Sequence, residues 1–258
     1  MMKNNFKLFK NFCLYNKKSV KTKIYNGKNE IYSIIKNNRD IAIKKIHNNL
    51  YNPNEYLILS KLDNKSIIKV YNKFNINNYN YIEMEYYKEG DLHTYLLQNI
   101  NNLSESDLIN IFKKIIEPVR YCHNNNVVHL DIKLENFLIN KDNIILCDFG
   151  FARFCNGSYY YENKISNVQG TFSYLSPELY FDKYFSKATD IWSMGILLYI
   201  MLNRKLPIEN NINILYNDKP KFNSNYSLEL NELLADLLEI NHKNRPTVYD
   251  LSNYSILK

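Results

Sequence analysis

The chain has little glycine, proline, tryptophan and cysteine. Its 258 residues include six glycines, six prolines, one tryptophan and four cysteines, with no internal repeat and no low-complexity linker. No apolar run approaches the ~18–20 residues of a membrane-spanning helix. The cysteines form no CxxC pair and no metal-site spacing, which favours an intracellular location, cytoplasmic or nuclear. With 45% hydrophobic and 23% charged residues, the composition is that of an ordinary globular protein.

Acidic residues are absent from the first 29 positions, which carry eight lysines. Of 33 basic and 26 acidic residues, 25 basic and all 26 acidic ones lie beyond these positions, so the remainder has a net charge of −1. This balance does not favour nucleic-acid binding. Residues 1–17 form a basic extension that lacks the apolar core of a signal peptide and the arginines of a transit peptide. The extension is either solvated or a contact for an anionic surface or a partner.

The N-terminal part of the chain favours strands. Residues 18–46 and 66–86 alternate between apolar and polar positions and are rich in β-branched and aromatic residues. Between them, Asn52 followed by Pro53 has the pattern of a helix N-cap and first helical residue. We expect that helix to run to about Leu62.

The C-terminal part favours helices. Ser104 and Asp107 form a capping-box pattern, and apolar residues then follow at helical spacing, with a kink expected at Pro118. Further helices are predicted from residue 190 onward and over 230–240. The sequence therefore predicts an α+β chain with a small strand-rich half and a larger helical half.

The segment FLINKDNIILCD indicates a β-hairpin: two apolar strands flank a polar turn. If Asn140 opposes Asn143, then Asn136 lies opposite Cys147 and next to Asp148. The hairpin thus returns Asp148 to the polar run that precedes it.

That polar run, HLDIKLEN at 129–136, carries Asp131, Lys133 and Asn136. With Asp148 beside it, an amide oxygen and a carboxylate converge next to a second carboxylate and an ammonium group. Such oxygen donors suit Mg²⁺, which takes few protein ligands together with phosphate oxygens.

At this point the chain resembles the eukaryotic-type protein kinases over about residues 18–250, with a bilobal fold and an active site between the lobes. The motifs that carry the resemblance occur in the family's order: IAIK (41–44), HLDIKLEN, DFG (148–150), GTFSY (170–174), SPE (176–178), DIWSMG (190–195) and NRP (244–246). The implied kinase domain is 18–258, with an N-lobe over about 18–86 and a C-lobe over about 90–258.

The resemblance implies a role for each matching residue. Asp131 would be the base, Lys133 would stabilise the transferring phosphate, and Asn136 and Asp148 would bind Mg²⁺ or Mn²⁺. The positions implied at the ATP site are Tyr25, Gly27, Ala42, Lys44, Glu55, Met84, Glu85, Tyr87, Asp91, Leu138 and Asp148. Structural support is implied for Glu178, Asp190 and Arg245, with Arg245 paired to Glu178.

The resemblance also implies a substrate class. Lys133, two residues after Asp131, and the GT pair at 170–171 match the pattern of serine/threonine kinases. The chain also resembles the calmodulin-dependent-kinase-like subgroup. Asp91 and Glu135 match acidic positions that, in many relatives, face a basic residue upstream of the phosphorylated one. We therefore expect protein substrates with upstream basic residues.

Three departures from the family pattern bear on activity. The phosphate-binding turn keeps only Gly27 of the usual three glycines. Tyr25 and, depending on a one-residue gap, Asn29 or Glu30 take the other two places, and a glutamate there would repel phosphate. Glu55 lies only eleven positions after Lys44, so it either caps its own helix or, as its helical phase favours, pairs with Lys44. Leu130 replaces the arginine that normally meets a phosphate on the activation loop, so loop phosphorylation is not expected to be required.

Three functions remain compatible with these patterns. The complete set Lys44, Asp131, Asn136 and Asp148 favours an active serine/threonine kinase, whereas the eroded glycine turn fits a pseudokinase scaffold. A small-molecule kinase of related fold is disfavoured, because GTFSYLSPE with Arg245 matches a peptide-docking platform. Since the tail after Arg245 is short, control is expected from partners, the basic extension or expression level.

Overall fold

A computed structural model of the chain describes residues 22–26, 29–36, 38–155, 157–160, 162–206 and 226–258. The basic extension and Gly27 lie outside these residues. The chain divides into two compact units: unit 1 comprises residues 1–63 and 68–88, and unit 2 comprises residues 64–67 and 89–258.

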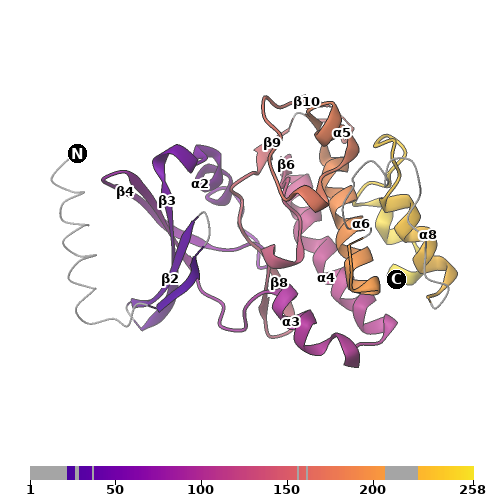
Figure 1. The fold of residues 1–258 in the computed structure, drawn as a ribbon, viewed down its shortest axis with the longest axis horizontal. Coiled ribbons are helices and arrows are strands. Elements are labelled where there is room, and N and C mark those ends of the chain that lie inside the picture. Colours follow the sequence, from indigo (N-terminus) through magenta and orange to yellow (C-terminus); the bar gives the residue numbers. More distant parts are fainter. Residues whose placement is uncertain (1–21, 27–28, 37, 156, 161, 207–225) are drawn as a thin grey trace. The chain divides into compact units, whose positions relative to one another are not determined.

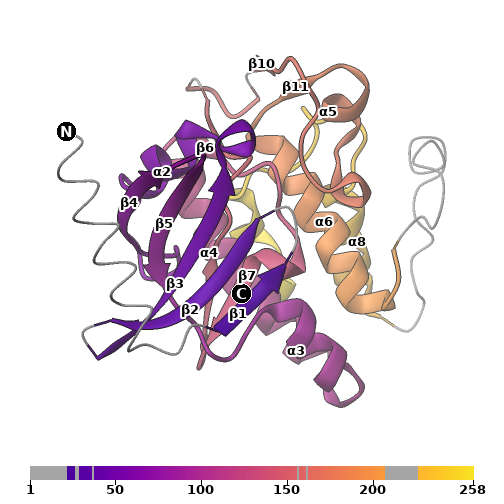
Figure 2. The same cartoon turned by 60° about the vertical axis from the view of Figure 1, so that its left-hand side comes forward.

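Unit 1 is built around one antiparallel sheet of five strands in the order β1-β2-β3-β5-β4, with helix α2 beside β4 (Figure 2). Its elements are β1 (Thr22–Asn26), β2 (Glu30–Lys36), β3 (Arg39–His47), the 3₁₀ turn η1 (Asn48–Leu50), α2 (Pro53–Leu59), β4 (Val70–Ile76) and β5 (Tyr79–Glu85). The central strand β3 pairs with β2 on one side and β5 on the other, and Ile41, Ile43 and Ile46 are buried. The predicted strand-rich half is thus a real sheet.

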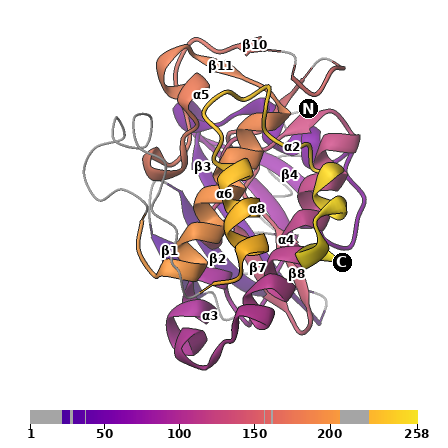
Figure 3. The same ribbon diagram turned by 90° about the vertical axis from the view of Figure 1, so that its right-hand side faces the viewer.

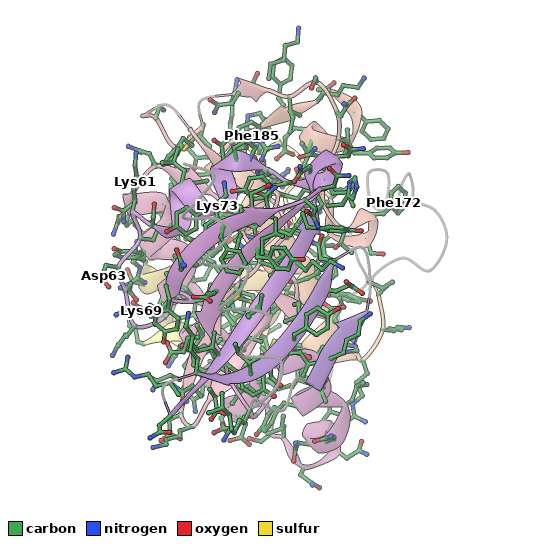
Figure 4. The ribbon with its side chains drawn as sticks, turned by 90° about the vertical axis from the view of Figure 1, so that its left-hand side faces the viewer. Lys61, Asp63, Lys69, Lys73, Phe172 and Phe185 are labelled. Atoms are coloured by element: carbon green, nitrogen blue, oxygen red, sulfur yellow. The ribbon has the colours of Figure 1, made fainter. Side chains whose placement is uncertain are left out.

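Charged residues cluster beside strand β4, which forms one edge of this sheet. Figure 4 shows the side chains of Lys61, Asp63, Lys69 and Lys73 on this side of unit 1. Charges at an edge strand oppose pairing with another chain. Lys73 also lies over the Tyr51 ring, 4.3 Å from its centroid, in a cation–π contact.

Two helices end earlier than the apolar pattern predicts. Helix α2 begins at Pro53 as expected but stops at Leu59, because the Ser60 hydroxyl donates to the Leu57 carbonyl and competes for the backbone. Leu62 is nevertheless buried, so the apolar period outlasts the helix. Similarly, helix α8 (Leu228–Leu237) stops before residue 240.

Unit 2 is mainly helical (Figure 1). Its helices are α3 (Leu92–Asn99), α4 (Glu105–Asn124), α5 (Pro177–Phe181), α6 (Lys187–Asn203) and α8, with the 3₁₀ turns η2 (Ile100–Asn102), η3 (Leu134–Asn136), η4 (Phe172–Tyr174), η5 (Asp250–Asn253) and η6 (Ser255–Leu257). Its short strands are β6 (Val127–Val128), β7 (Phe137–Asn140), β8 (Asn143–Leu146), β9 (Arg153–Phe154), β10 (Asn163–Lys164) and β11 (Tyr184–Phe185). Within the described ranges, no helix has the length and apolar character to cross a membrane.

Helix α6 is the centre of the unit 2 core, and nearly all of its residues are buried. Helix α8 lies against it (Figure 3), and Gly195 makes the close approach possible: a Cβ there would lie 2.8 Å from Leu238 Cδ2 and 2.9 Å from Leu237 Cβ. The capping box of Ser104 and Asp107 starts α4 as predicted, and α4 continues past Pro118 to Asn124.

The predicted hairpin is present in the predicted register. Asn140 pairs with Asn143 across β7 and β8, and the Cys147 N–H donates to the Asn136 carbonyl at 2.9 Å. This pairing brings Asp148 next to Asn136 within unit 2.

Candidate active site

The first functional group lies in unit 1, where β3 and α2 bring Lys44 and Glu55 together. The Lys44 Nζ lies 2.5 Å from Glu55 Oε1, and the two residues are only 4% and 2% exposed. The helix N-cap is made by Asn52, whose side chain accepts the Asn54 N–H at 3.1 Å, and the Glu55 carboxylate contacts Lys44. An ammonium group is thereby fixed on the central strand by a buried counter-charge.

The neighbouring turn between β1 and β2 has its acidic residue neutralised. Glu30 Oε1 lies 2.6 Å from Lys23 Nζ, and its Oε2 lies 2.7 Å from Lys45 Nζ. The hydrogen bonds from Lys23 and then Lys45 lower the pKa of Glu30 to about 2. Gly27 lies outside the described residues, and Tyr25 is described only through its backbone, which belongs to β1. The repulsion expected from Glu30 is therefore offset by two lysines.

The resemblance places Met84 at the back of the nucleotide pocket and Glu85–Tyr87 as the hinge, at the end of β5 and just beyond it. Met84 is buried opposite Ala42 on β3. The Glu85 N–H donates to the Lys69 carbonyl at 2.9 Å, and the Glu85 carboxylate accepts the Tyr87 hydroxyl at 2.9 Å. The N–H of Glu85 is therefore already used inside unit 1.

Besides Asp148, two residues predicted at the nucleotide lie in unit 2, Asp91 and Leu138. Asp91 is the N-cap of α3, where its carboxylate accepts the Thr94 N–H at 2.8 Å and the Thr94 hydroxyl at 3.1 Å. Leu138, on β7, is half-buried and forms a β-bridge with Asp91. The Asp91 carboxylate is therefore engaged in capping its own helix, α3.

The loop that carries Asp131 is held from behind by Asp190 of α6. The fully buried Asp190 carboxylate accepts the N–H groups of His129 and Leu130, each at 2.9 Å, and lies 3.0 Å from His123 Nε2. Leu130 has φ +64°, a left-handed conformation that costs about 1–2 kcal/mol for a residue other than glycine. Asp190 thus stabilises a strained loop through its backbone.

The His129 ring links this loop to the DFG segment. Its Nδ1 accepts the Asp131 N–H at 3.3 Å, which leaves Nε2 to donate to the Cys147 carbonyl at 3.1 Å. The ring also packs edge-on against Phe149, with 4.7 Å between centroids. His129 therefore fixes Asp131 relative to the residue before Asp148.

The Asp131 carboxylate is the centre of the site in unit 2 and is 3% exposed. Its Oδ1 accepts the Thr171 N–H at 2.9 Å and the Thr171 hydroxyl at 2.7 Å. Lys133 Nζ lies 3.0 Å from Asp131 Oδ2 and donates to Thr171 Oγ1 at 2.7 Å. A carboxylate, an ammonium group and a hydroxyl thus share one small cluster, in which the carboxylate can accept a proton and the ammonium group can stabilise negative charge.

The Asn136 amide completes this cluster and leads to Asp148. Its Nδ2 donates to the Asp131 carbonyl at 2.7 Å and to Asp131 Oδ2 at 3.0 Å. That orientation leaves the amide oxygen as a donor for a metal, with the Asp148 carboxylate nearby through the hairpin pairing. Asp148 adopts φ +57°. One amide oxygen and one carboxylate fit the few-ligand mode of Mg²⁺.

The segment that follows is fixed at its far end. Gly170 has φ +117°, and a Cβ at this position would lie 2.8 Å from the Leu130 carbonyl oxygen, so the close approach requires glycine. Glu178 and Arg245 form a bidentate ion pair, in which the Nη1–Oε1 and Nη2–Oε2 distances are both 2.8 Å. Although burial raises the pKa of Glu178, the charge and hydrogen bonds of Arg245 outweigh it and lower the pKa below its usual value.

Next to Gly170, the GTFSY segment exposes an aromatic residue. Phe172 is 56% exposed, and Figure 4 shows its side chain pointing outward.

Sequence reasoning missed the direct contacts of Thr171, His129 and His123. Thr171 and His129 both stand inside quoted motifs, GTFSY and HLD, which are the signals that could have identified them. His123 has no comparable signal, because its contact with Asp190 joins residues 67 positions apart.

Comparison with known proteins agrees with this geometry. The family model described as "Protein kinase domain" matches residues 19–256. Calcium-dependent protein kinase 5 of Plasmodium berghei (strain Anka) is 33% identical over 224 residues, which cover 82% of this chain and 39% of that protein. The probable serine/threonine-protein kinase nek3 of Dictyostelium discoideum is 36% identical over 214 residues, covering 77% of this chain and 19% of the relative.

A human relative, NUAK family SNF1-like kinase 2, is 32% identical over 232 residues, covering 85% of this chain and 35% of the relative. The chain thus spans about a fifth to two fifths of the length of these relatives. With a family model that matches almost its whole length, the chain belongs to the protein kinase family.

Proposed function

We propose that this domain transfers the γ-phosphate of ATP to the hydroxyl group of serine or threonine in protein substrates. The observation that carries the proposal is the cluster in which Asp131 and Lys133 meet at Thr171. In the reaction, the hydroxyl oxygen bonds to the γ-phosphorus, the bond from that phosphorus to the β–γ bridging oxygen breaks, and ADP leaves. Asp131 orients the hydroxyl and accepts its proton, while Lys133 stabilises the charge on the transferring group.

On the nucleotide side, Lys44 is the residue proposed to hold the α- and β-phosphates. Glu55 supports this role because the buried ion pair fixes the ammonium group on β3. Ala42 and Leu138 are proposed to enclose the adenine, with Met84 behind it and the backbone of Glu85 to Tyr87 as the hinge. Because the Glu85 N–H is engaged by Lys69, hinge hydrogen bonds come from the other backbone groups.

Asn136 and Asp148 are the proposed holders of Mg²⁺, or of Mn²⁺ in its place. When bound, such an ion would neutralise phosphate charge and align the phosphates for transfer. The donor set supports this choice, because an amide oxygen and a carboxylate are hard ligands and leave coordination positions for phosphate oxygens.

A preference for basic residues upstream of the phosphorylated residue is proposed from Glu135 and Asp91. Glu135 is exposed within the catalytic loop, HLDIKLEN at 129–136, whereas the Asp91 carboxylate is occupied by its helix cap. Glu135 is therefore the stronger contributor. A peptide array in which an upstream arginine gives no increase in phosphorylation would contradict this preference.

Phosphorylation of the segment between DFG and SPE is proposed to be dispensable. Leu130 is buried at the position of the usual arginine, and the nearby Arg153 already donates to Gln169 Oε1 at 2.7 Å. A cytoplasmic or nuclear location and a contact between the basic extension and an anionic surface are further proposals, which rest on the sequence.

The direct test is transfer of labelled phosphate from ATP·Mg²⁺ to a generic basic protein. Loss of a general base typically lowers rates about 10²–10⁴-fold, which is the decrease expected for Asp131→Asn. Equal signals from the wild-type and variant proteins would dismiss the proposal and favour the pseudokinase scaffold.

A further inference from the structure

We propose that Tyr159 is a positioning residue for phosphate transfer. It lies in the activation segment, defined here as residues 148–178, and fastens the middle of that segment to the C-terminal stretch 245–249. It also packs behind the catalytic loop through His123 and Asp190. The inference rests on the proposed function for its catalytic consequence and on geometry for its structural part.

Two successive tyrosines hold the activation segment on the C-terminal stretch. The Tyr159 hydroxyl accepts the Val248 N–H at 2.9 Å, and the Tyr160 hydroxyl donates to the Arg245 carbonyl at 2.7 Å. The two rings meet edge-on at 5.2 Å, and Tyr159 lies 6.5 Å from the Tyr249 ring. Together these residues form a tyrosine anchor, comprising Tyr159, Tyr160, Arg245, Val248 and Tyr249.

The Tyr159 hydroxyl is enclosed even though the residue as a whole is only half-buried. Burial raises its pKa well above the usual value for tyrosine, and Val248 is fully buried. If Tyr159 leaves, the Val248 N–H loses its hydrogen bond in an enclosed environment, which is unfavourable. The hydrogen bond to Val248 therefore stabilises Tyr159 in its position on the C-terminal stretch.

The Tyr159 ring packs against His123, and His123 contacts the Asp190 carboxylate that binds the catalytic loop. It packs edge-on against His123, with 5.5 Å between centroids and an angle of 76°. His123 is fully buried, and its Nε2 contacts Asp190, whereas its Nδ1 has no hydrogen-bond partner among the described residues. With one ring nitrogen engaged, the His123 orientation depends on packing against Tyr159.

This packing continues to the reacting groups through a short set of contacts. Asp190 receives the N–H groups of His129 and Leu130, and Leu130 immediately precedes Asp131. Misplacement of a positioned group by about 1 Å can cost about 10²-fold in rate. A shift of His123 would therefore move Asp190, and with it the loop that carries Asp131, through the hydrogen bonds from the His129 and Leu130 N–H groups.

The C-terminal stretch also fixes the end of the activation segment. The Arg245 guanidinium binds the Glu178 carboxylate, while the Arg245 carbonyl accepts the Tyr160 hydroxyl. The middle and the end of the activation segment thus both contact Arg245, the middle through its carbonyl group and the end through its side chain. In a chain with Leu130 in place of an arginine, the tyrosine anchor orders the segment with uncharged groups.

The test compares Tyr159→Ala with Tyr159→Phe in the full chain, using a basic peptide substrate and ATP·Mg²⁺. Loss of the ring is expected to lower kcat about 10–100-fold with little change in KM for ATP. Tyr159→Phe keeps the ring against His123 and loses one hydrogen bond, so its kcat is expected within about threefold of wild type. Tyr254→Phe is the control, since its hydroxyl contacts Asp236 outside the anchor.

A second measurement is independent of activity. Amide hydrogen exchange across the described residues 157–160 and 162–170 is expected to accelerate in Tyr159→Ala and to stay near the wild-type rate in Tyr254→Phe. The proposal is overturned by an active wild type whose Tyr159→Ala variant keeps its kcat, or by equal losses in Ala and Phe with unchanged exchange. A wild type that transfers no phosphate overturns the proposed function instead, and the kinase assay alone reveals that result.

Discussion

Unit 1 and unit 2 hold their functional groups by different means. In unit 1, Lys44 is fixed by a side-chain ion pair with Glu55, and Glu30 is fixed by two lysines. In unit 2, the catalytic loop is fixed through its backbone, because the Asp190 carboxylate accepts two consecutive N–H groups. The difference follows from the local structure: a sheet strand already has its backbone paired, whereas a loop does not.

Substitutions in the two units should therefore disturb different parts of the structure, side-chain charge balance in unit 1 and backbone conformation in unit 2. Removing a charge in unit 1 leaves its partner without a counter-charge, while the backbone pairing of the sheet stays intact. Removing an acceptor in unit 2 releases the backbone itself and with it the strained conformation of Leu130. Four substitutions test this difference, in order of decreasing expected effect.

The largest effect is expected from Lys44→Met. It leaves the Glu55 carboxylate buried without its counter-charge, a change that typically costs about 3–5 kcal/mol. The measurement is the free energy of unfolding in urea. Lys88→Met is the control, because Lys88 pairs with Asp40 on an exposed surface, where loss of the pair should have a much smaller effect. Equal losses in both variants would remove the distinction between the buried and the exposed pair.

Asp190→Asn is expected to come next. An amide has one acceptor oxygen, so it cannot serve both N–H groups and His123, and an unsatisfied buried group costs about 1–3 kcal/mol. Both the free energy of unfolding and kcat should fall, since Leu130 can relax out of its left-handed conformation. Asp236→Asn, near the surface, is the control. An unchanged kcat would mean that the loop geometry does not depend on Asp190.

Thr171→Val should act on catalysis rather than on stability. Valine has the same shape but lacks the hydroxyl between Asp131 and Lys133. Loss of a hydrogen bond to a charged group, worth about 1.5–3 kcal/mol, predicts a decrease in kcat of about tenfold or more. Thr171→Ser should retain most of the activity. A serine variant as impaired as the valine variant would show that the methyl group matters instead.

The smallest effect is expected from Glu30→Gln, and it depends on pH. The folded-state pKa of Glu30 is about 2, below its ordinary value of 4.5, so its ion pairs stabilise the folded state fully above pH 4.5. As the pH falls toward 2, this contribution is lost. The wild type should exceed the variant slightly in its urea midpoint at about pH 6, and the difference should narrow by about pH 3. A difference that grows on acidification would contradict the assignment.

Much of the fold could be predicted because it depends on local patterns. The capping box at Ser104, the start of α2 at Pro53 and the register Asn140–Asn143 follow from neighbouring residues alone. The family was predicted from motifs in the family's order, and the family model confirms it. The roles of the catalytic-loop residues stay predictions. The prediction that α2 ends at about Leu62 was wrong. The Ser60 hydroxyl competes for the backbone, and the spacing of apolar residues does not reveal such a contact.

The remaining features depend on contacts between distant residues. The positive φ of Leu130 follows from Asp190, sixty positions away. The contact of Tyr159 with Val248 spans 89 positions, and nothing in either local sequence indicates it. Such contacts are determined by how helices pack, so a single sequence without its structure gives no period or spacing from which to infer them.

Arg245 has a consequence for how this domain tolerates shortening. Its side chain contacts Glu178 and the carbonyls of Ala188, Glu239 and Ile240, and it stacks over the Trp192 ring at 5.0 Å. A series of truncations advancing from the C-terminus should therefore first lose the buried Leu251 and Val248, and should show its largest single loss of stability when Arg245 is removed. Variants that still contain Arg245 should keep the ion pair with Glu178, and variants that end before it should lose that pair.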